Sequence, residues 1–336
     1  MEIVLAMKNK NVAAVSVGDV PSMSDRLFSD LVPNEGFSGL CTVLGGETLG
    51  VSAPKSASLQ LSDVSGRIFG SCELSVGDLP PLPCIAEVAA TIHCDEESHL
   101  VAVVHEIRPA RVFRLRALPI GTFPEAGAAA AGRLWGLYEG LQPHFKQFVD
   151  DALSDPEIRR RFFQVPASRR CHHVDEGGLA EHSVTSAEIA QTMASMVLND
   201  RNEIDAAVVV ALFHDLGKIG PLRTKVRHPA VSHEDRGLLF LAGALARLSA
   251  THPMVHEVVL AALTHRGESG CCPVSRITSD ADRLSATISA RANAAAQAED
   301  WQSVLKLECG GKGRTFFRPL PAATEHGFSQ PAAAMG

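Results

Sequence analysis

The spacing of apolar and polar positions changes along the chain from a two-residue period to a helical one. Between residues 37 and 116, apolar positions are β-branched or alternate with polar ones, which is typical of short strands. The expected strands lie at 37–46, 56–74, 85–94 and 99–108, and the second range is a hairpin with Ser65-Gly66 in its turn. Further turns are expected at Gly45-Gly46 and over 63–66 and 95–98. About five strands in roughly eighty residues favour a small β-barrel.

Helical spacing follows a Pro/Gly/Ala-rich stretch at 117–127, which we interpret as a linker. Apolar residues then recur every three or four positions, which predicts six helices and an all-α domain over 128–300. The six segments are 134–153, 182–198, 203–218, 233–249, 254–265 and 279–297.

The predicted fold class is therefore α+β and multidomain. An N-terminal segment (1–36) precedes the barrel (37–116), the linker and the helical domain, and a hairpin and tail (301–336) end the chain. We expect roughly the last 15 residues to be disordered, because they lack apolar periodicity.

Composition and charge narrow the class of protein. The 336 residues are 46% hydrophobic and 21% charged, with a formal net charge of −7. No strongly basic field covers the whole protein, so an anionic substrate must be attracted locally. The eight cysteines form no regular framework, and no apolar run reaches the ~20 residues of a membrane span or resembles a signal peptide. We expect a reduced, cytoplasmic protein with no membrane partner.

Metal-ligand side chains gather in the helical region. Nine of the fourteen histidines lie between residues 172 and 265. His214 and Asp215 close a very apolar segment, where an unpaired carboxylate is costly to bury unless a cation satisfies it. His182 and Asp282 lie on other predicted helices and could reach the same centre, as in bundle-core metal sites. Imidazole and carboxylate together suit Mn, Fe, Co, Ni, Zn and, less well, Mg.

Three segments, HSVTSAEIA, ALFHDLGK and ADRLSA, resemble the HD-domain metal-dependent phosphohydrolases, whose signature is H…HD…D. The resemblance covers about 160–295. Carried over by position, it implies a metal set of His182, His214, Asp215 and Asp282. Family members with two metals have further histidines before the last aspartate, which makes His233 and His265 candidates. The resemblance thus implies one or two divalent metal ions and hydrolysis of a phosphate ester.

The upstream segment FFQVPASRRCHHVDEGGLAEHS is similar to two HD subfamilies. One is the YhaM-type 3′→5′ exoribonucleases, which place an OB-fold before the HD domain, and the other is the TraI/MobH group of conjugative relaxases. The predicted barrel resembles an OB-fold, since a hairpin is followed by a closing strand. The order of domains therefore favours the YhaM type. The chain departs from it at His265-Arg266-Gly267, where those exonucleases commonly have His-His-Gly.

The resemblance also implies roles for the polar residues near the predicted metals. Asp215 and Lys218 are the candidate catalytic residues. Lys218 lies three residues after Asp215, so we expect its ammonium group to contact the phosphate of the substrate. The barrel would hold a single strand by stacking and charge. The candidate substrate contacts are Lys218, Arg169, Arg170, His172, His173, Arg223 and Arg266. His172 and His173 could instead support a metal ligand or pack within their loop. The predicted function is a metal-dependent phosphodiesterase that degrades single-stranded nucleic acid, RNA in preference to DNA, from its 3′ end.

Other interpretations stay open from the sequence. A relaxase-like protein that nicks or binds DNA, an HD enzyme for nucleotides or cyclic dinucleotides, and a degenerate binding protein each fit part of the pattern. Asp280 competes with Asp282 as the last ligand, and His233 has a structural alternative beside the helix cap Ser232. His265 could be a C-terminal helix histidine stabilised by the helix dipole. The barrel offers few stacking surfaces, because its aromatic residues are Phe37, Phe69 and Phe113.

Overall fold

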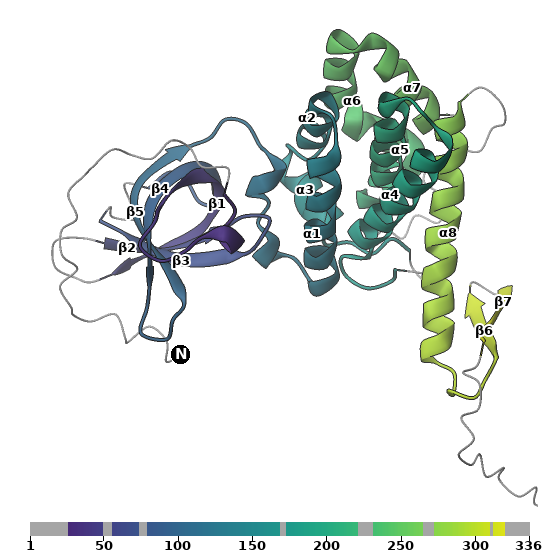
Figure 1. Cartoon of the computed structure of the whole chain (residues 1–336), viewed down its shortest axis with the longest axis horizontal. Coiled ribbons are helices and arrows are strands. Elements are labelled where there is room, and N and C mark those ends of the chain that lie inside the picture. Colours follow the sequence, from purple (N-terminus) through teal and green to yellow (C-terminus); the bar gives the residue numbers. More distant parts are fainter. Residues whose placement is uncertain are drawn as a thin grey trace, which may run out of the picture. The chain divides into compact units, whose positions relative to one another are not determined.

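Five strands of the N-terminal unit close into a barrel (Figure 1). The structure, a computed structural model, describes residues 26–49, 56–73, 79–168, 173–220, 231–264, 272–309 and 312–319. The chain divides into two units at residue 111. The strand order is β1-β2-β3-β5-β4, with β4 returning to β1, and every pairing is antiparallel except β3 with β5. The strands are β1 (Gly36–Leu49), β2 (Ser56–Ser62), β3 (Arg67–Cys72), β4 (Cys84–Cys94) and β5 (Leu100–Pro109).

Alternation along the strands fills the barrel with apolar side chains. On β4, the buried positions are every second residue, Ala86, Val88, Ala90 and Ile92. Phe37 joins the same buried cluster and packs edge to face on Phe28, with 5.4 Å between the ring centroids. The small barrel predicted from the alternating pattern is confirmed.

Two of the predicted turns are confirmed and one is wrong. The N–H of Asp63 donates to the Gly66 carbonyl at 3.0 Å, and the N–H of Asp95 donates to the His99 carbonyl at 2.9 Å. No turn forms at Gly45-Gly46, because β1 continues to its end at residue 49 and its pairing with β2 shifts register beside Gly45. A glycine inside a strand commonly marks such a bulge.

The second unit is helical and contains eight α-helices within its described ranges (Figure 1). Helix α5 packs against both α4 and α8, and every residue of α5 from Asp205 to Phe213 is buried. The helices are α1 (Glu125–Gly140), α2 (Pro143–Ala152), α3 (Pro156–Phe162), α4 (Gly178–Val197), α5 (Arg201–Phe213), α6 (His233–Thr251), α7 (Pro253–Thr264) and α8 (Pro273–Ala296).

The single helix expected over 134–153 is wrong, because the chain breaks between α1 and α2. Gln142 is extended, with ψ 155°, and Pro143 begins α2. Proline lacks an N–H and disfavours a helical residue before it. Helix α3 was not expected, although Asp155 accepts from two backbone N–H groups of its first turn and Pro156 begins it.

The stretch interpreted as a linker is partly helical and packed. Helix α1 already begins at Glu125, and short 3-10 helices precede it at Leu115–Ala117 and Ile120–Thr122. The carboxylate of Asp150 accepts from the N–H of Leu115 at 2.8 Å, so this segment is fixed to α2.

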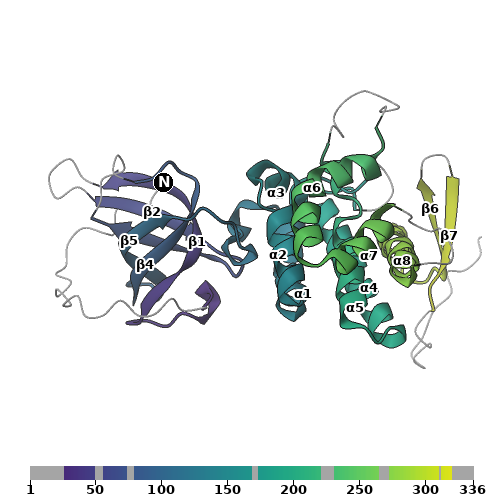
Figure 2. The same ribbon diagram turned by 90° about the horizontal axis from the view of Figure 1, so that it is seen from above.

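The C-terminal hairpin is confirmed. Strands β6 (Val304–Cys309) and β7 (Lys312–Phe317) pair antiparallel and lie beside α8 in both ribbon views (Figures 1 and 2). The last 15 or so residues, predicted to be disordered, lie outside the described residues.

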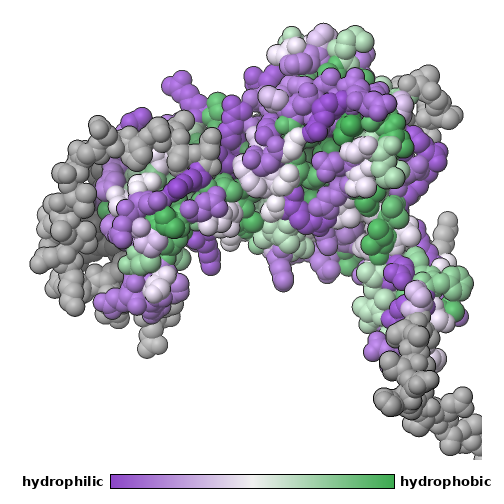
Figure 3. Space-filling model, in the orientation of Figure 1, coloured by the Kyte–Doolittle hydropathy of each residue, from purple (hydrophilic) through white to green (hydrophobic). Residues whose placement is uncertain are grey.

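Apolar side chains also reach the surface of the helical unit (Figure 3). They include Met196 and Val197 at the end of α4 and Leu284 and Ile288 on α8. Even so, no helix within the described ranges has both the length and the apolar character needed to cross a membrane.

Candidate metal centre

Four of the predicted ligands meet inside the helical unit. His182 lies on α4, His214 and Asp215 directly follow α5, and Asp282 lies on α8. One potential ligand atom from each of the four lies within 4.8 Å of the others. His182, His214 and Asp215 are at most 3% exposed, whereas Asp282 is partly exposed. The cluster is therefore buried and opens toward solvent at Asp282.

Two glycines let the backbone place these residues. Gly177 precedes α4 with φ 84°, a left-handed conformation that favours glycine, and a Cβ there would lie 2.4 Å from the backbone nitrogen of Gly127. At Gly217, a Cβ would lie 1.8 Å from the carbonyl oxygen of His233. Glycine at 217 thus allows the start of α6 to approach the 3-10 helix η5 (Leu216–Ile219), which brings His233 beside the cluster.

The hydrogen bonds of the two buried imidazoles define their tautomers. His214 Nδ1 lies 2.7 Å from the Ala211 carbonyl oxygen, which can only accept, so Nδ1 carries the proton. His182 Nδ1 lies 3.0 Å from Ser285 Oγ, while the Ser285 hydroxyl donates to the His182 carbonyl at 3.4 Å. The serine oxygen therefore accepts from Nδ1–H. Both Nε2 atoms then present lone pairs, the form in which histidine binds a metal.

Each of these Nε2 atoms faces both carboxylates. His182 Nε2 lies 3.1 Å from Asp282 Oδ1 and 3.4 Å from Asp215 Oδ2. The corresponding distances from His214 Nε2 are 3.5 and 3.2 Å. When no metal is bound, these Nε2 atoms can carry protons and donate to the carboxylates. Burial alone raises the pKa of both carboxyl groups, but these imidazole donors outweigh it and lower each pKa below its ordinary value. Two imidazoles and two carboxylates converging in this way are a donor set that fits a divalent metal.

Asp215 also faces a second group of potential ligands. Its Oδ1 lies 3.3 Å from His233 Nε2, and the same nitrogen lies 3.1 Å from Glu234 Oε1. Its Oδ2 accepts from the Lys218 ammonium at 2.5 Å. The two oxygens of one carboxylate thus serve two sets of neighbours, an arrangement that suits a ligand shared between two metals.

A cleft of about 670 Å³ opens over these side chains. Asp215, Asp282, His233 and Glu234 line one part of it. Three cations line it from different elements, namely Lys218 of η5, Arg283 of α8 and Arg314 of β7. A metal site beside positive side chains is suited to an anionic substrate, because guanidinium and ammonium groups bind phosphate oxygens strongly.

Residues 179–287 match the family model of the HD domain. The match contains all four clustered residues and His233. Together with the His/Asp cluster, the HD domain indicates a metal-dependent phosphohydrolase, so the prediction of such an enzyme is confirmed. A comparison with curated proteins finds no match to this chain.

The packing of α8 separates the two aspartates that the sequence offers for the last ligand position. Asp280 accepts from Arg276 at 2.7 Å on the helix surface, whereas Asp282 joins the cluster. Ser232 caps α6, and the adjacent His233 still reaches Asp215, so the cap and the contact coexist.

The other predicted substrate contacts differ in their outcome. His173 lies behind the cluster, with its side chain 7% exposed, its Nδ1 2.9 Å from Glu181 Oε2 and its ring 5.3 Å from that of His182. His173 therefore packs on the His182 ring and is not among the residues that line the cleft. The remaining candidate substrate contacts lie outside the described residues, namely Arg169, Arg170, His172, Arg223 and Arg266. The candidate metal ligand His265 also lies outside them.

Several further residues of the site carry no predicted role from the sequence, among them Arg283 and Thr287 of α8. Glu234 directly follows the candidate ligand His233, so its carboxylate could have been recognised from the sequence as a further candidate ligand. Ser285 follows Asp282 by three positions, which places both on one face of α8. Arg314 lies beyond the HD domain, in a hairpin whose packing the sequence alone does not reveal.

Proposed function

We propose that this chain is a metal-dependent phosphodiesterase that shortens single-stranded nucleic acid from its 3′ end, RNA in preference to DNA. The observation that carries the proposal is the convergence of four metal-ligand side chains in an open cleft that also holds cations. A phosphodiester is an anion, and this cleft offers both a place for a metal and positive groups for phosphate oxygens.

The metal-ligand side chains and Lys218 each have a place in such a reaction. The four clustered residues would hold a divalent ion, which when bound supplies Lewis acidity and a water of lowered pKa. Asp215 would be shared with a second metal position at His233 and Glu234. Lys218, held at 2.5 Å by Asp215, would donate to a phosphate oxygen of the substrate in the same cleft.

The barrel supports a nucleic-acid substrate. Its strand order, with β1 pairing to β4 and a parallel β3–β5 pair, leads us to assign it to the OB-folds, which bind oligonucleotides on the face of strands 2 and 3. Phe37 and Phe113 are buried, but Phe69 on β3 is 57% exposed and offers one surface for base stacking. A barrel followed by an HD domain is also the order of the YhaM-type exoribonucleases that the sequence resembles.

Incubation of the full chain with Mn²⁺ and a 5′-labelled single strand tests this function. We expect a ladder of shortened products, faster for RNA than for DNA, and no product from a circular strand, which has no 3′ end. Asp282→Asn should abolish the ladder, whereas Asp280→Asn, which alters a neighbour outside the cluster, should retain it. A metal-loaded protein that leaves the linear strand intact overturns the proposal. Cleavage of the circle overturns its 3′-end direction.

A further inference from the structure

The hairpin that follows the HD domain is held firmly against α8. Leu305 and Leu307 of β6 form a buried cluster with alanines of the last turns of α8, and Phe316 of β7 packs on it. At the open end of the hairpin, the Arg318 guanidinium donates to three backbone carbonyls of the connecting loop, at 2.7, 3.1 and 3.0 Å. The hairpin is thus fixed to α8 at both its apolar face and its base.

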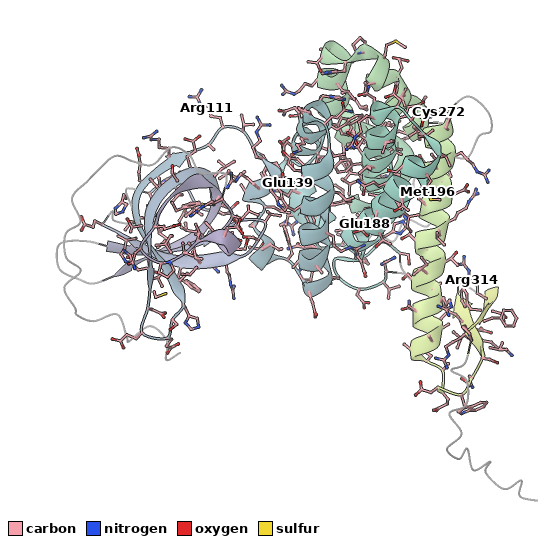
Figure 4. All side chains as sticks on the ribbon, viewed as in Figure 1. Arg111, Glu139, Glu188, Met196, Cys272 and Arg314 are labelled. Carbon is pink, nitrogen blue, oxygen red and sulfur yellow. The ribbon has the colours of Figure 1, made fainter. Side chains whose placement is uncertain are left out.

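The strand register puts an arginine on the face of the hairpin that meets α8. Phe316 pairs directly with Leu305, and Arg314 pairs with Leu307. Directly paired residues share a face of the sheet, so Arg314 lies on the same face as the buried leucines. It is nevertheless exposed, and it lines the cleft of the metal cluster. Figure 4 labels Arg314 on the hairpin beside α8. The hairpin therefore carries a positive charge to the site on a face that is otherwise apolar.

Arg314 shares this part of the cleft with two residues of α8, Arg283 and Thr287. They lie four positions apart, so both face the same side of the helix. Of the other described cations of the cleft, Lys218 contacts Asp215 at 2.5 Å, and Arg283 forms a longer, solvent-exposed contact of 3.5 Å with Asp280. Among the described residues, no carboxylate forms an ion pair with Arg314. Its guanidinium is therefore available to an anionic ligand.

We propose that Arg314, with Arg283, binds a second phosphate group of the substrate, next to the phosphate cleaved at the metal cluster. This inference rests on the proposed phosphodiesterase function. Each guanidinium offers a planar fork that matches two phosphate oxygens. The Thr287 hydroxyl lines the same part of the cleft but donates to the Arg283 carbonyl at 2.7 Å. A substrate with one phosphate leaves this site unused, so the hairpin makes the cleft select substrates with two or more phosphates.

Ligand pairs that differ by one phosphate test the site without turnover. Binding to the full chain with Mn²⁺ is measured by isothermal titration calorimetry. One pair is a thymidine dinucleotide and trinucleotide with phosphorothioate linkages; the other is a nucleoside 5′-phosphonate and the α,β-methylene analogue of its diphosphate. We expect the added phosphate to tighten binding roughly tenfold in at least one pair.

Variants of the hairpin identify the residue responsible. Arg314→Ala should remove the gain from the added phosphate, and Arg314→Lys, which keeps the charge but loses the fork, should retain part of it. Lys306→Ala is the matched control, because it removes an exposed cation of β6 that alternates away from the buried leucines. Metal content equal to that of the wild type shows that each variant is folded around an intact cluster.

The outcomes separate this site from the proposed function. A gain confined to the nucleotide pair keeps the phosphate site and overturns the single-strand substrate. No gain in either pair overturns the site, as does a gain that survives Arg314→Ala. An equal loss in Lys306→Ala also overturns it, because the effect would then be the general charge of the hairpin.

Discussion

Asp63 in the barrel and Asp215 in the HD domain are buried to nearly the same extent, at 1% and 3% exposure, but their partners differ in kind. Asp63 accepts from the backbone N–H groups of Phe28, Ser65 and Gly66, at 2.8, 2.8 and 3.1 Å. Two of these donors belong to its own turn. The partners of Asp215 are ionisable side chains. His214 and Lys218 lie within three residues of Asp215, whereas His182 and His233 come from α4 and α6.

The difference appears in the acidity of the two groups. Burial raises the pKa of Asp63, and its hydrogen-bond donors only partly offset this. Burial acts in the same direction on Asp215, but the imidazoles reverse it and hold the pKa well below its ordinary value. Burial alone therefore does not distinguish a structural carboxylate from one in a metal site. The distinction lies in whether its partners are neutral backbone N–H groups or ionisable side chains.

Replacing Asp215 by alanine should produce the largest effect. Removal of a ligand shared by both proposed metal positions should release bound metal and lower phosphodiester hydrolysis by at least roughly 100-fold, more than the loss of an outer hydrogen bond. Elemental analysis and a chromogenic diester assay measure both effects, and circular dichroism should show helix content near that of the wild type. Full metal and full turnover in this variant would mean that the site is wrongly assigned.

Removing the Ser285 hydroxyl should have the next largest effect. Ser285→Ala deletes the acceptor that sets the His182 tautomer, which should weaken metal affinity by roughly 10–100-fold. Thr278→Val is the control, since that buried hydroxyl of α8 makes no hydrogen bond within the described residues. Metal titration gives the affinity, and the imidazole nitrogen shifts of His182 report its tautomer by nuclear magnetic resonance. Equal affinity in both variants would remove Ser285 from the site.

The same kind of change at Asp63 should affect stability and leave the metal site unaltered. In Asp63→Asn, an amide NH₂ replaces one acceptor, so the N–H of Phe28 or of the turn loses its partner at a cost of about 1–3 kcal/mol of unfolding free energy. Hydrogen–deuterium exchange should accelerate in β2 and β3, which flank the turn, while metal content stays constant. Asp30→Asn, at an exposed position, is the control. Metal loss on changing Asp63 would contradict the comparison.

Acid should act on the two aspartates with opposite sign in the metal-free protein. The folded-state pKa of Asp215 is lowered, so its contribution to stability is present above the unfolded value of about 3.9 and is lost as pH falls through the folded value. The pKa of Asp63 is raised, so its contribution is present below the unfolded value and is lost as pH rises through the folded value. Urea unfolding of Asp215→Asn and Asp63→Asn against the wild type, from neutral pH to about pH 2, measures this.

We expect the stability cost of Asp215→Asn to shrink with falling pH and that of Asp63→Asn to grow. Tryptophan fluorescence follows the helical unit that holds Asp215, since Trp135 and Trp301 both lie in it. Hydrogen–deuterium exchange of β2 and β3 in urea follows the barrel that holds Asp63. The same pH trend in both variants would show that the difference in partners does not control the acidity of the two groups.

Local patterns account for what could be predicted. Alternation along β4 and helical spacing along α6 identified the barrel and the bundle, because burial on one face imposes the period of each element. The His214-Asp215 pair stood out because it closes a very apolar segment. Errors occurred where one residue overrides a pattern, as Pro143 does between α1 and α2 and Gly45 does at the bulge in β1.

By itself, the sequence determined the order of the two units, the metal-ligand residue types and the signature that places four of them in an HD domain. Only the tertiary structure decided which aspartate of α8 joins the cluster, that Ser285 orients His182 across a sequence separation of 103, and that Arg314 reaches the cleft. The physical reason is that periodicity reports which face of an element is buried. The partner that a side chain meets on that face depends on how separate elements pack and on strand register.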